Sequence, residues 1–204
     1  MNVPLKNPAK NPPKKRGRPR AFDPQQALAD ATTTFLRHGY SGASLEALTD
    51  AMGVNKPSLY AAFGDKRGLF VRALEERSRA LAKRYRAAWD RGDTLETSLR
   101  AFFLEAVVIN VDDQDVPGCI FGSAAITEAV TDEGVAALTR EFFAYCDRGV
   151  AKWMEERKPG SGTLARMANG IVHDIALRAR IGETKAELRA YAREAARALA
   201  AGAA

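Results

Sequence analysis

The sequence predicts an all-α protein, with an N-terminal three-helix helix-turn-helix domain followed by a larger C-terminal helical domain. Apolar residues recur at helical spacing along most of the chain, and cap residues, glycine and proline separate the helical segments. No convincing strand pattern and no internal repeat occurs in the sequence. A chain of 204 residues with 46% hydrophobic content is long enough to bury a core of this kind.

The first two expected helices lie between residues 23 and 53. The first one ends at Gly39, and three residues open it as an N-cap, a favoured first residue and a capping-box partner: Asp23, Pro24 and Gln26. Ser44 is a good N-cap for the second helix, and Gly53 supplies the left-handed turn that ends it. The apolar face of the second helix consists of Leu45, Leu48 and Met52.

The third expected helix begins at Lys56 and is barely two turns long. Asn55 can cap it, and Leu59 and Phe63 face inward because they are four residues apart. Gly64 ends the helix before Asp65 caps the next one. A helix this short is marginal alone, so neighbouring helices must hold its apolar face. The side chains then turned outward are Lys56, Ser58, Tyr60 and Ala61. Such a helix fits the major groove of B-DNA, and an ordinary helical hairpin with a solvated face is the alternative.

A basic arm precedes these helices. Residues 1–20 carry seven lysines and arginines and no acid, so the rest of the chain has a net charge of −1 against +6 for the whole. Its proline and asparagine content predicts that residues 1–21 form a disordered arm. The run Arg16-Gly17-Arg18-Pro19-Arg20 is typical of arms that enter an A·T-rich minor groove. A solubilising tail with only phosphate attraction is the alternative.

The arm GRPRAFDP and the tract VNKPSLYAAFGDKRGLF resemble the TetR (AcrR-type) family of transcriptional regulators over about residues 18–74. The resemblance implies a DNA-binding domain at residues 22–68 and a ligand-binding and dimerisation domain at residues 69–204. It implies a homodimeric repressor that binds a palindromic double-stranded DNA operator and is released by a small apolar or electrophilic effector. Carried onto matching positions, it implies DNA contacts from Arg18, Arg20, Ser44, Lys56, Pro57, Ser58, Tyr60 and Lys66. Lys56 is the best candidate for a base edge, whereas Ser44 and Lys66 are expected at phosphates.

The remaining helices are expected after residue 65, separated by glycine, proline and acidic turns. Asp93 and Glu96 suggest a capping box for the second of them, and Thr184 and Glu187 suggest one for the last. The expected ranges are 66–90, 94–110, 119–130, 132–158, 164–180 and 184–201. The first range is long enough to link the two domains mechanically.

The last two expected helices carry apolar stripes. They consist of Leu164, Met167, Ile171 and Ile175 in one helix and Leu188, Tyr191, Ala195 and Leu199 in the other. Two such helices can meet their symmetry mates as a four-helix bundle, which is the dimer mode that the family resemblance implies. The alternative is that these stripes complete the core of the monomer.

Aromatic and apolar residues of the C-terminal domain are candidates for an effector site between the helices. The candidates are Trp89, Phe103, Val107, Cys119, Phe121, Phe143 and Trp153, and ordinary core packing is the alternative for each. Cys119 is also a candidate sensor, because a helix N-terminus lowers a thiol pKa and the surrounding tract resembles a GCLL-type segment of some TetR regulators. A buried structural cysteine is the alternative.

Other classes of function have little support in the sequence. His38 and His173 have no partner at metal-ligand spacing, and no nucleophile elbow or phosphate-binding glycine loop occurs, so no enzyme activity, metal or cofactor is expected. No membrane span or secretory signal is apparent, and two cysteines suit a reducing cytoplasm. The alternatives that remain are a nonspecific or architectural DNA-binding protein, an electrophile or redox sensor acting through Cys119, and a ligand carrier that has kept the fold.

Overall fold

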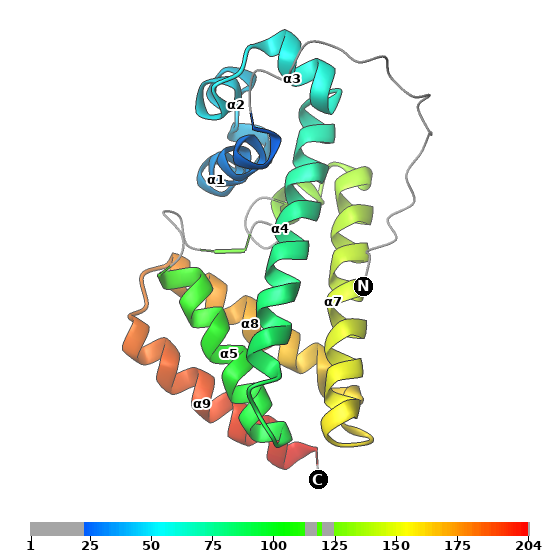
Figure 1. The fold of residues 1–204 in the computed structure, drawn as a ribbon, viewed down its shortest axis with the longest axis vertical. Helices are drawn as coiled ribbons and strands as arrows, with labels where there is room; N and C mark the ends of the chain where they lie inside the picture. Colours follow the sequence, from blue (N-terminus) through cyan, green and yellow to red (C-terminus); the bar gives the residue numbers. More distant parts are fainter. Residues whose placement is uncertain (1–22, 113–117, 120–124, 204) are drawn as a thin grey trace.

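The computed structural model describes residues 23–112, 118–119 and 125–203, and this part of the chain is helical without strands (Figure 1). The predicted all-α class is therefore confirmed. The helices are α1 (Pro24–Gly42), α2 (Leu45–Met52), α3 (Lys56–Phe63), α4 (Lys66–Trp89), α5 (Leu95–Val111), α6 (Ile126–Glu128), α7 (Glu133–Arg157), α8 (Ala165–Arg180) and α9 (Lys185–Gly202). A 3₁₀ turn at Ser161–Leu164 precedes α8.

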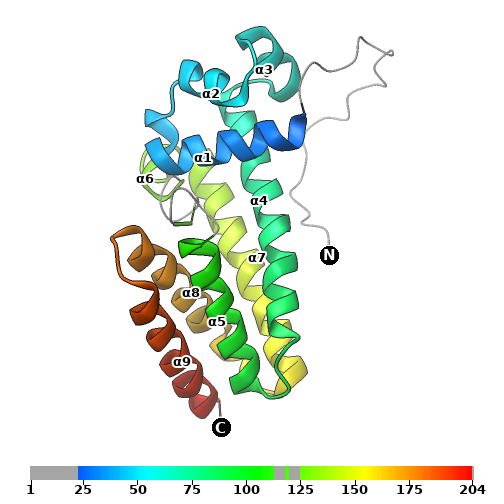
Figure 2. The ribbon, with the colours of Figure 1, turned by 60° about the vertical axis from the view of Figure 1, so that its left-hand side comes forward.

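The helices α1, α2 and α3 pack with the first turns of α4 around an N-terminal core. Figure 2 shows α1 lying across α4, with α2 and α3 beyond it. The largest fully buried side chains of this core are Phe35, Leu48, Leu59, Leu69 and Phe70. Ala125, next to α6, and Val135 on α7 are buried in the same core, so the C-terminal part of the chain contributes to it. The N-terminal helix-turn-helix unit is thus seated on α6 and α7.

The caps that the sequence predicts at the short helices are present. The side chains of Ser44, Asn55 and Asp65 each accept a hydrogen bond from an amide three residues ahead, at 3.0, 2.8 and 2.7 Å. Gly53 ends α2 with φ 61° and ψ 32°, the left-handed conformation that glycine adopts without a Cβ penalty. These local interactions fix where α2, α3 and α4 begin and how sharply the chain turns between them.

Two predicted capping boxes are wrong. The Gln26 side chain donates to Asp30 at 2.9 Å instead of reaching back to the N-cap, and α1 is capped by Asp23 alone. At α5 the box is formed by Thr94 and Thr97, because a threonine hydroxyl at the third helical position can both donate and accept. The chain departs from helical geometry at Gly39, as predicted, yet α1 resumes and ends at Gly42.

Among the described residues of the predicted helix 119–130, only a short stretch is α-helical. The α-helix there covers only Ile126–Glu128, Cys119 is not helical, and residues 120–124 lie outside the described part. The other C-terminal helices begin and end within a few residues of the predicted positions. The Thr184 and Glu187 capping box at α9 is confirmed.

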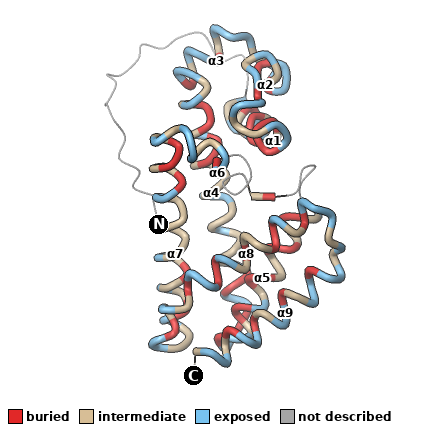
Figure 3. Tube along the Cα trace, turned by 180° about the vertical axis from the view of Figure 1, so that it is seen from behind, coloured by how far each residue is buried: buried red, intermediate tan, exposed pale blue. Residues whose placement is uncertain are grey.

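The C-terminal core lies where α5 packs against α8 and α9, with α4 and α7 beside them (Figure 3). Its largest fully buried side chains are Trp89, Phe102, Phe103, Leu99, Met154 and Ile175. Ile175, Leu188 and Leu199, three residues of the stripes predicted to form a dimer, belong to this monomer core. Met167 and Leu177 on the opposite face of α8, and Ile181 directly after the helix, are instead 59%, 57% and 75% exposed.

Candidate nucleic-acid interface

The helix α3 separates its buried and exposed side chains as the sequence predicts. Leu59 and Phe63 are buried in the N-terminal core, whereas Lys56 and Pro57 are exposed and Tyr60 is 45% exposed. The helix α3 lies at the end of the molecule opposite the C-terminus (Figure 3). Its N-terminal turn therefore offers polar and aromatic groups on a rigidly capped helix, which is the geometry that a major-groove reader needs.

Lys56 is oriented by an acid that the sequence analysis did not single out. Its ammonium lies 3.2 Å from Glu46 Oε1, and the two side chains are 48% and 79% exposed. Because solvent screens such a pair, it contributes about 1 kcal/mol or less and is readily exchanged for a base edge or a phosphate. Sequence spacing gave no signal for Glu46, since it is ten residues from Lys56 and the turn at Gly53 brings the two together.

The Ser44 and Ser58 side chains lie at the N-terminal ends of α2 and α3. The Ser44 hydroxyl already caps α2, and the Ser58 amide already donates to the Asn55 side chain. The partial positive charge at both helix N-termini remains available to a phosphate. Ser44 is exposed and Ser58 is half-buried, so both positions are compatible with the predicted contacts.

Lys66 is partly engaged within the protein. Its Nζ donates to the Ser41 carbonyl at 3.3 Å and lies 4.7 Å above the centre of the Tyr40 ring. Burial lowers the pKa of Lys66, and the nearby Glu128 carboxylate opposes that shift. An ammonium has three donors, so this contact leaves two for a phosphate. The structure thus ties a predicted DNA contact to the end of α1 and to α6.

The described DNA-binding helices are not basic by themselves. Residues 23–68 contain four lysines and arginines against five acids, and the predicted minor-groove residues Arg18 and Arg20 lie outside the described residues. Long-range attraction to phosphates therefore depends on the basic residues 1–20.

The structure places four of the predicted effector residues in the C-terminal core. Trp89, Phe103 and Val107 are fully buried in the C-terminal core, and Trp153 packs against that core. These side chains pack tightly, and the ring centres of Trp89 and Trp153 are 6.2 Å apart. This packing matches ordinary core packing, the alternative that the sequence allowed for each of them. Phe121 lies outside the described residues.

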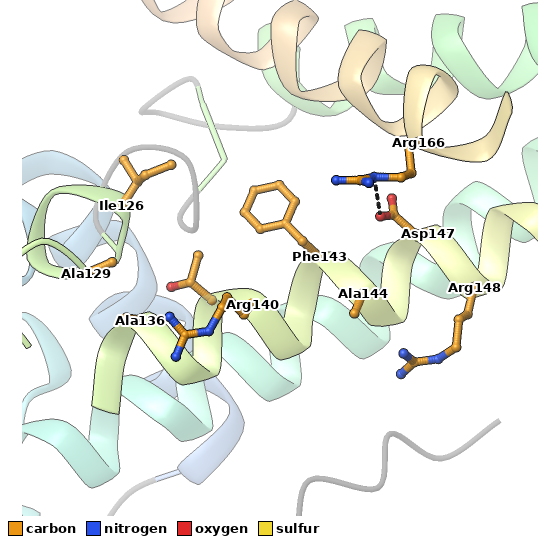
Figure 4. Close-up of a pocket in the computed structure, with 10 residues that line it drawn as sticks. Ile126, Ala129, Ala136, Arg140, Phe143, Ala144, Asp147, Arg148 and Arg166 are labelled. Atoms are coloured by element: carbon orange, nitrogen blue, oxygen red, sulfur yellow. Dashed lines mark ion pairs between the residues drawn. The ribbon is translucent and has the colours of Figure 1, made fainter. Parts of the chain in front are cut away.

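Phe143 lines a groove that the sequence did not reveal, here called the α7 groove. Its volume is about 700 Å³. The residues that line it are Ile126, Ala129, Ala136, Thr139, Arg140, Phe143, Ala144, Asp147, Arg148 and Arg166. Figure 4 shows Ile126 and Ala129 at one end of the groove and Arg166 of α8 near the other, with Phe143 and Asp147 pointing to the same side of α7 and Arg148 to the opposite side. A signal was present in the sequence, because Ala136, Arg140, Ala144 and Arg148 recur at every fourth position and so share one helix face.

The two cysteines are half-buried free thiols. Cys119 packs against the N-terminal core beside Gly118. Burial raises the pKa of the Cys146 thiol, with a smaller contribution from Cys119, so Cys146 is a poor nucleophile. The predicted lowering of the Cys119 pKa by a helix N-terminus remains a prediction, since residues 120–124 are outside the described part.

The described residues contain neither a candidate metal site nor a helix that could span a membrane. The described side chains include no group of three or more histidine, cysteine, aspartate or glutamate residues that could bind a metal ion. Among the helices of residues 23–112 and 125–203, none is both long and apolar enough to cross a bilayer.

The sequence of this chain matches known bacterial regulators. The profile of the family described as "Bacterial regulatory proteins, tetR family" matches residues 27–73. The chain is 52% identical over 60 residues to the HTH-type transcriptional repressor BdcR of Escherichia coli (strain K12), a match that covers 29% of this chain and 30% of BdcR. It is 29% identical over 185 residues to the HTH-type transcriptional repressor ComR of the same strain, covering 86% of this chain and 88% of ComR.

The fold also resembles a solved structure of a protein–DNA complex. That structure contains a cysteine mutant of the TetR family transcriptional regulator CifR with 26-base-pair double-strand operator DNA. The similarity has a TM-score of 0.80 at 30% sequence identity, and it covers 89% of this chain and 99% of the CifR chain.

Proposed function

The chain belongs to the TetR family of bacterial regulatory proteins, and we propose that it is a homodimeric repressor that binds a palindromic DNA operator and is released by a small-molecule effector. The observation that carries the proposal is the short α3, which is capped by Asn55 and anchored by Leu59 while Lys56 and Tyr60 face solvent. In this proposal, the division into residues 22–68 and 69–204 separates operator binding from effector binding and dimerisation.

We assign the operator contacts to the first turns of α2 and α3, the start of α4 and the basic arm. Lys56 donates to a base edge in the major groove, and Pro57, Ser58 and Tyr60 contact bases or the adjacent backbone. Ser44 and Lys66 contact phosphates, and Arg18 and Arg20 enter the minor groove. A regulator with these contacts acts on the genome and therefore in the cytoplasm.

We assign the dimer interface to α8 and α9. Met167 and Leu177 on α8 and Ile181 directly after it are exposed apolar side chains in the monomer, and α9 presents small alanine side chains to solvent. Exposed apolar faces of this kind mark interaction surfaces, and small residues allow close helix approach. The two α3 helices of the dimer then match half-sites about 34 to 36 Å apart, one turn of DNA.

Effector release follows from the separation of the two recognition helices. An effector that prefers a conformation with the wrong separation removes the dimer from DNA, and α4 links the two cores that such a change must connect. A strong shift in occupancy requires a preference of about 5 kcal/mol between the two conformations.

The operator contacts are tested by selecting binding sites from genomic DNA with the purified protein. We expect a palindromic site. Lys56→Ala should weaken binding to the selected operator by about 1 to 3 kcal/mol, with little effect on binding to random DNA. Lys66→Ala, the matched control, should weaken both DNAs alike and reduce the salt slope by about 1. Equal losses on both DNAs for both variants, or no preferred sequence at all, would indicate nonspecific or architectural binding instead.

The dimer interface is tested with Ile181→Glu, which places a charge at an exposed apolar position directly after α8 without disturbing the monomer core. Sedimentation should then show monomers, circular dichroism should show unchanged helix content, and operator affinity should fall by more than tenfold. A dimer that persists in this variant contradicts the assignment.

A further inference from the structure

We propose that the α7 groove binds a small organic anion with an apolar body and a terminal carboxylate, and that this anion is the effector class that releases the operator. The regulatory part of the inference rests on the proposed function, whereas binding to the groove does not. The groove has the size of a small-molecule site, since its volume is about 700 Å³.

The groove is apolar at one end. Ile126 on α6 and Ala129 directly after it lie at this end, Ala136 lies on the first turn of α7, and Phe143 lies between the two ends (Figure 4). Ile126 is 49% exposed, so an apolar ligand body would remove it from water. The Phe143 ring is supported from behind by His173, with ring centres 4.7 Å apart, and therefore offers a fixed apolar wall.

The charges that line the groove favour an anion. Three arginines and one aspartate line it, and the aspartate, Asp147, is already bound to Arg166 at 3.6 Å and to Asn169 at 2.8 Å. Arg140 is paired with Glu133 outside the groove. Within the described part of the chain, neither a hydrogen bond nor an ion pair engages the Arg148 guanidinium, which is exposed at the end of the groove away from Ile126 (Figure 4).

This arrangement matches one ligand chemistry. A guanidinium presents a planar set of donors that binds a carboxylate through two parallel hydrogen bonds. Ala136 and Arg148 are separated by about 18 Å along α7 at 1.5 Å per residue, so an elongated molecule can place its apolar part on α6 and its carboxylate at Arg148. A cation would face three guanidinium groups and gain only an aspartate that is already bound.

The apolar end of the groove is directly connected to the DNA-binding helices. Ile126 at the start of α6 and Ala129 directly after it line the groove. Ala125, which precedes Ile126, is buried in the N-terminal core, and Glu128 accepts a hydrogen bond from the Ser41 amide at 3.3 Å. The carbonyl of Ser41 accepts from Lys66, the first residue of α4. A ligand that moves α6 therefore acts on Ser41, whose amide donates to Glu128 and whose carbonyl accepts from Lys66, a proposed phosphate contact.

Binding is tested by calorimetry on the full-length protein with decanoate and its uncharged counterpart decanamide. We expect decanoate to bind and decanamide to bind at least tenfold more weakly. Arg148→Gln should lower the affinity for decanoate about tenfold and leave the affinity for decanamide unchanged, because the substitution removes the positive charge that binds the carboxylate. Ala144→Phe, which fills the groove, should weaken both compounds. The control Arg100→Gln, which removes an exposed arginine from α5, should change neither.

Equal affinity for the acid and the amide, an unaffected Arg148→Gln variant, or no binding of either compound would overturn the inference. A change of oligomeric state in Ala144→Phe, with decanoate binding unaltered, would assign the groove to a second copy of the chain and would overturn it as well.

Release is tested by titrating the operator complex with decanoate. The wild-type complex should lose at least tenfold in operator affinity. Glu128→Ala should bind decanoate normally yet respond less than threefold, because the link to Ser41 is cut. Normal decanoate binding with unchanged operator affinity would overturn the regulatory part alone. Failure of the ligand-free protein to select any operator would contradict the proposed function instead, and the calorimetric result would stand by itself.

Discussion

Replacing Asn55 by alanine removes the cap of the recognition helix and should weaken operator binding more than it destabilises the fold. The Asn55 side chain accepts a hydrogen bond of 2.8 Å from the Ser58 amide. Because α3 has only eight residues, its first turn depends on this cap far more than a long helix would. That turn carries Lys56 and Pro57, so fraying it disorders the proposed DNA contacts.

The size of the effect follows from the cap. Loss of an asparagine N-cap costs about 1 kcal/mol. DNA binding must restore the frayed turn in both subunits of the proposed dimer, which gives about 2 kcal/mol, or about a 30-fold rise in the operator Kd. The free energy of unfolding of each subunit should fall by only about 1 kcal/mol.

Two further variants separate capping from other effects. Thr94→Ala removes a similar cap from α5, far from the recognition helix, and should lower stability by about 1 kcal/mol without changing operator affinity. Asn55→Asp keeps the acceptor and so the stability, but its charge should repel phosphates and lower affinity most at low salt. Urea denaturation and fluorescence anisotropy with labelled operator measure both quantities. The reasoning is refuted if Asn55→Ala and Thr94→Ala lose equal stability and both keep full operator affinity.

Three other perturbations have defined outcomes. Gly92→Ala should lower the free energy of unfolding by about 3 kcal/mol or more, because the new Cβ would lie 2.2 Å from the Ser98 amide nitrogen. Gly149→Ala should raise it by about 1 kcal/mol, because its Cβ meets nothing within 4 Å. Equal stabilities in urea denaturation would contradict this contrast. Deleting residues 1–21 should flatten the dependence of log Kd on log salt by about 0.9 for each lost phosphate contact, and an unchanged slope would exclude the arm from the interface. Hydrogen bonds from two backbone amides lower the pKa of Glu155 below its ordinary 4.5, so its stabilising effect is present above that value and is lost as the pH falls. Glu155→Gln should therefore reduce the loss of stability in urea denaturation as the pH falls through and below 4.5, and an identical pH dependence in both proteins would refute this.

Local signals in the sequence predicted the helix-turn-helix well. Ser44, Gly53, Asn55 and Asp65 act on backbone groups within three residues, so their roles do not depend on the rest of the fold. Gln26 failed as a capping partner because a second acceptor, Asp30, lies one turn ahead and binds its side chain instead. A short motif specifies which contacts are feasible, and neighbouring side chains decide which of them forms.

The α7 groove was not predictable in the same way. Trp89, Phe103 and Phe143 have the same helical spacing and apolar character, yet the first two are fully buried and only Phe143 lines the α7 groove. The difference depends on how α6 and α8 are placed beside α7, which periodicity along one helix does not contain. The sequence likewise gave no reason to single out Arg148, which lines the same groove.

The helix α4 belongs to both cores, since Leu69, Phe70 and Leu74 lie in the N-terminal core while Trp89 lies in the C-terminal core. Its 24 residues form a continuous rod of about 36 Å. Unfolding of one core removes the packing that holds its part of α4 and so destabilises the same helix in the other core. We therefore expect the two cores to unfold together in one cooperative transition. Heating should therefore produce a single calorimetric peak, and damage to either half shortens the lifetime of both.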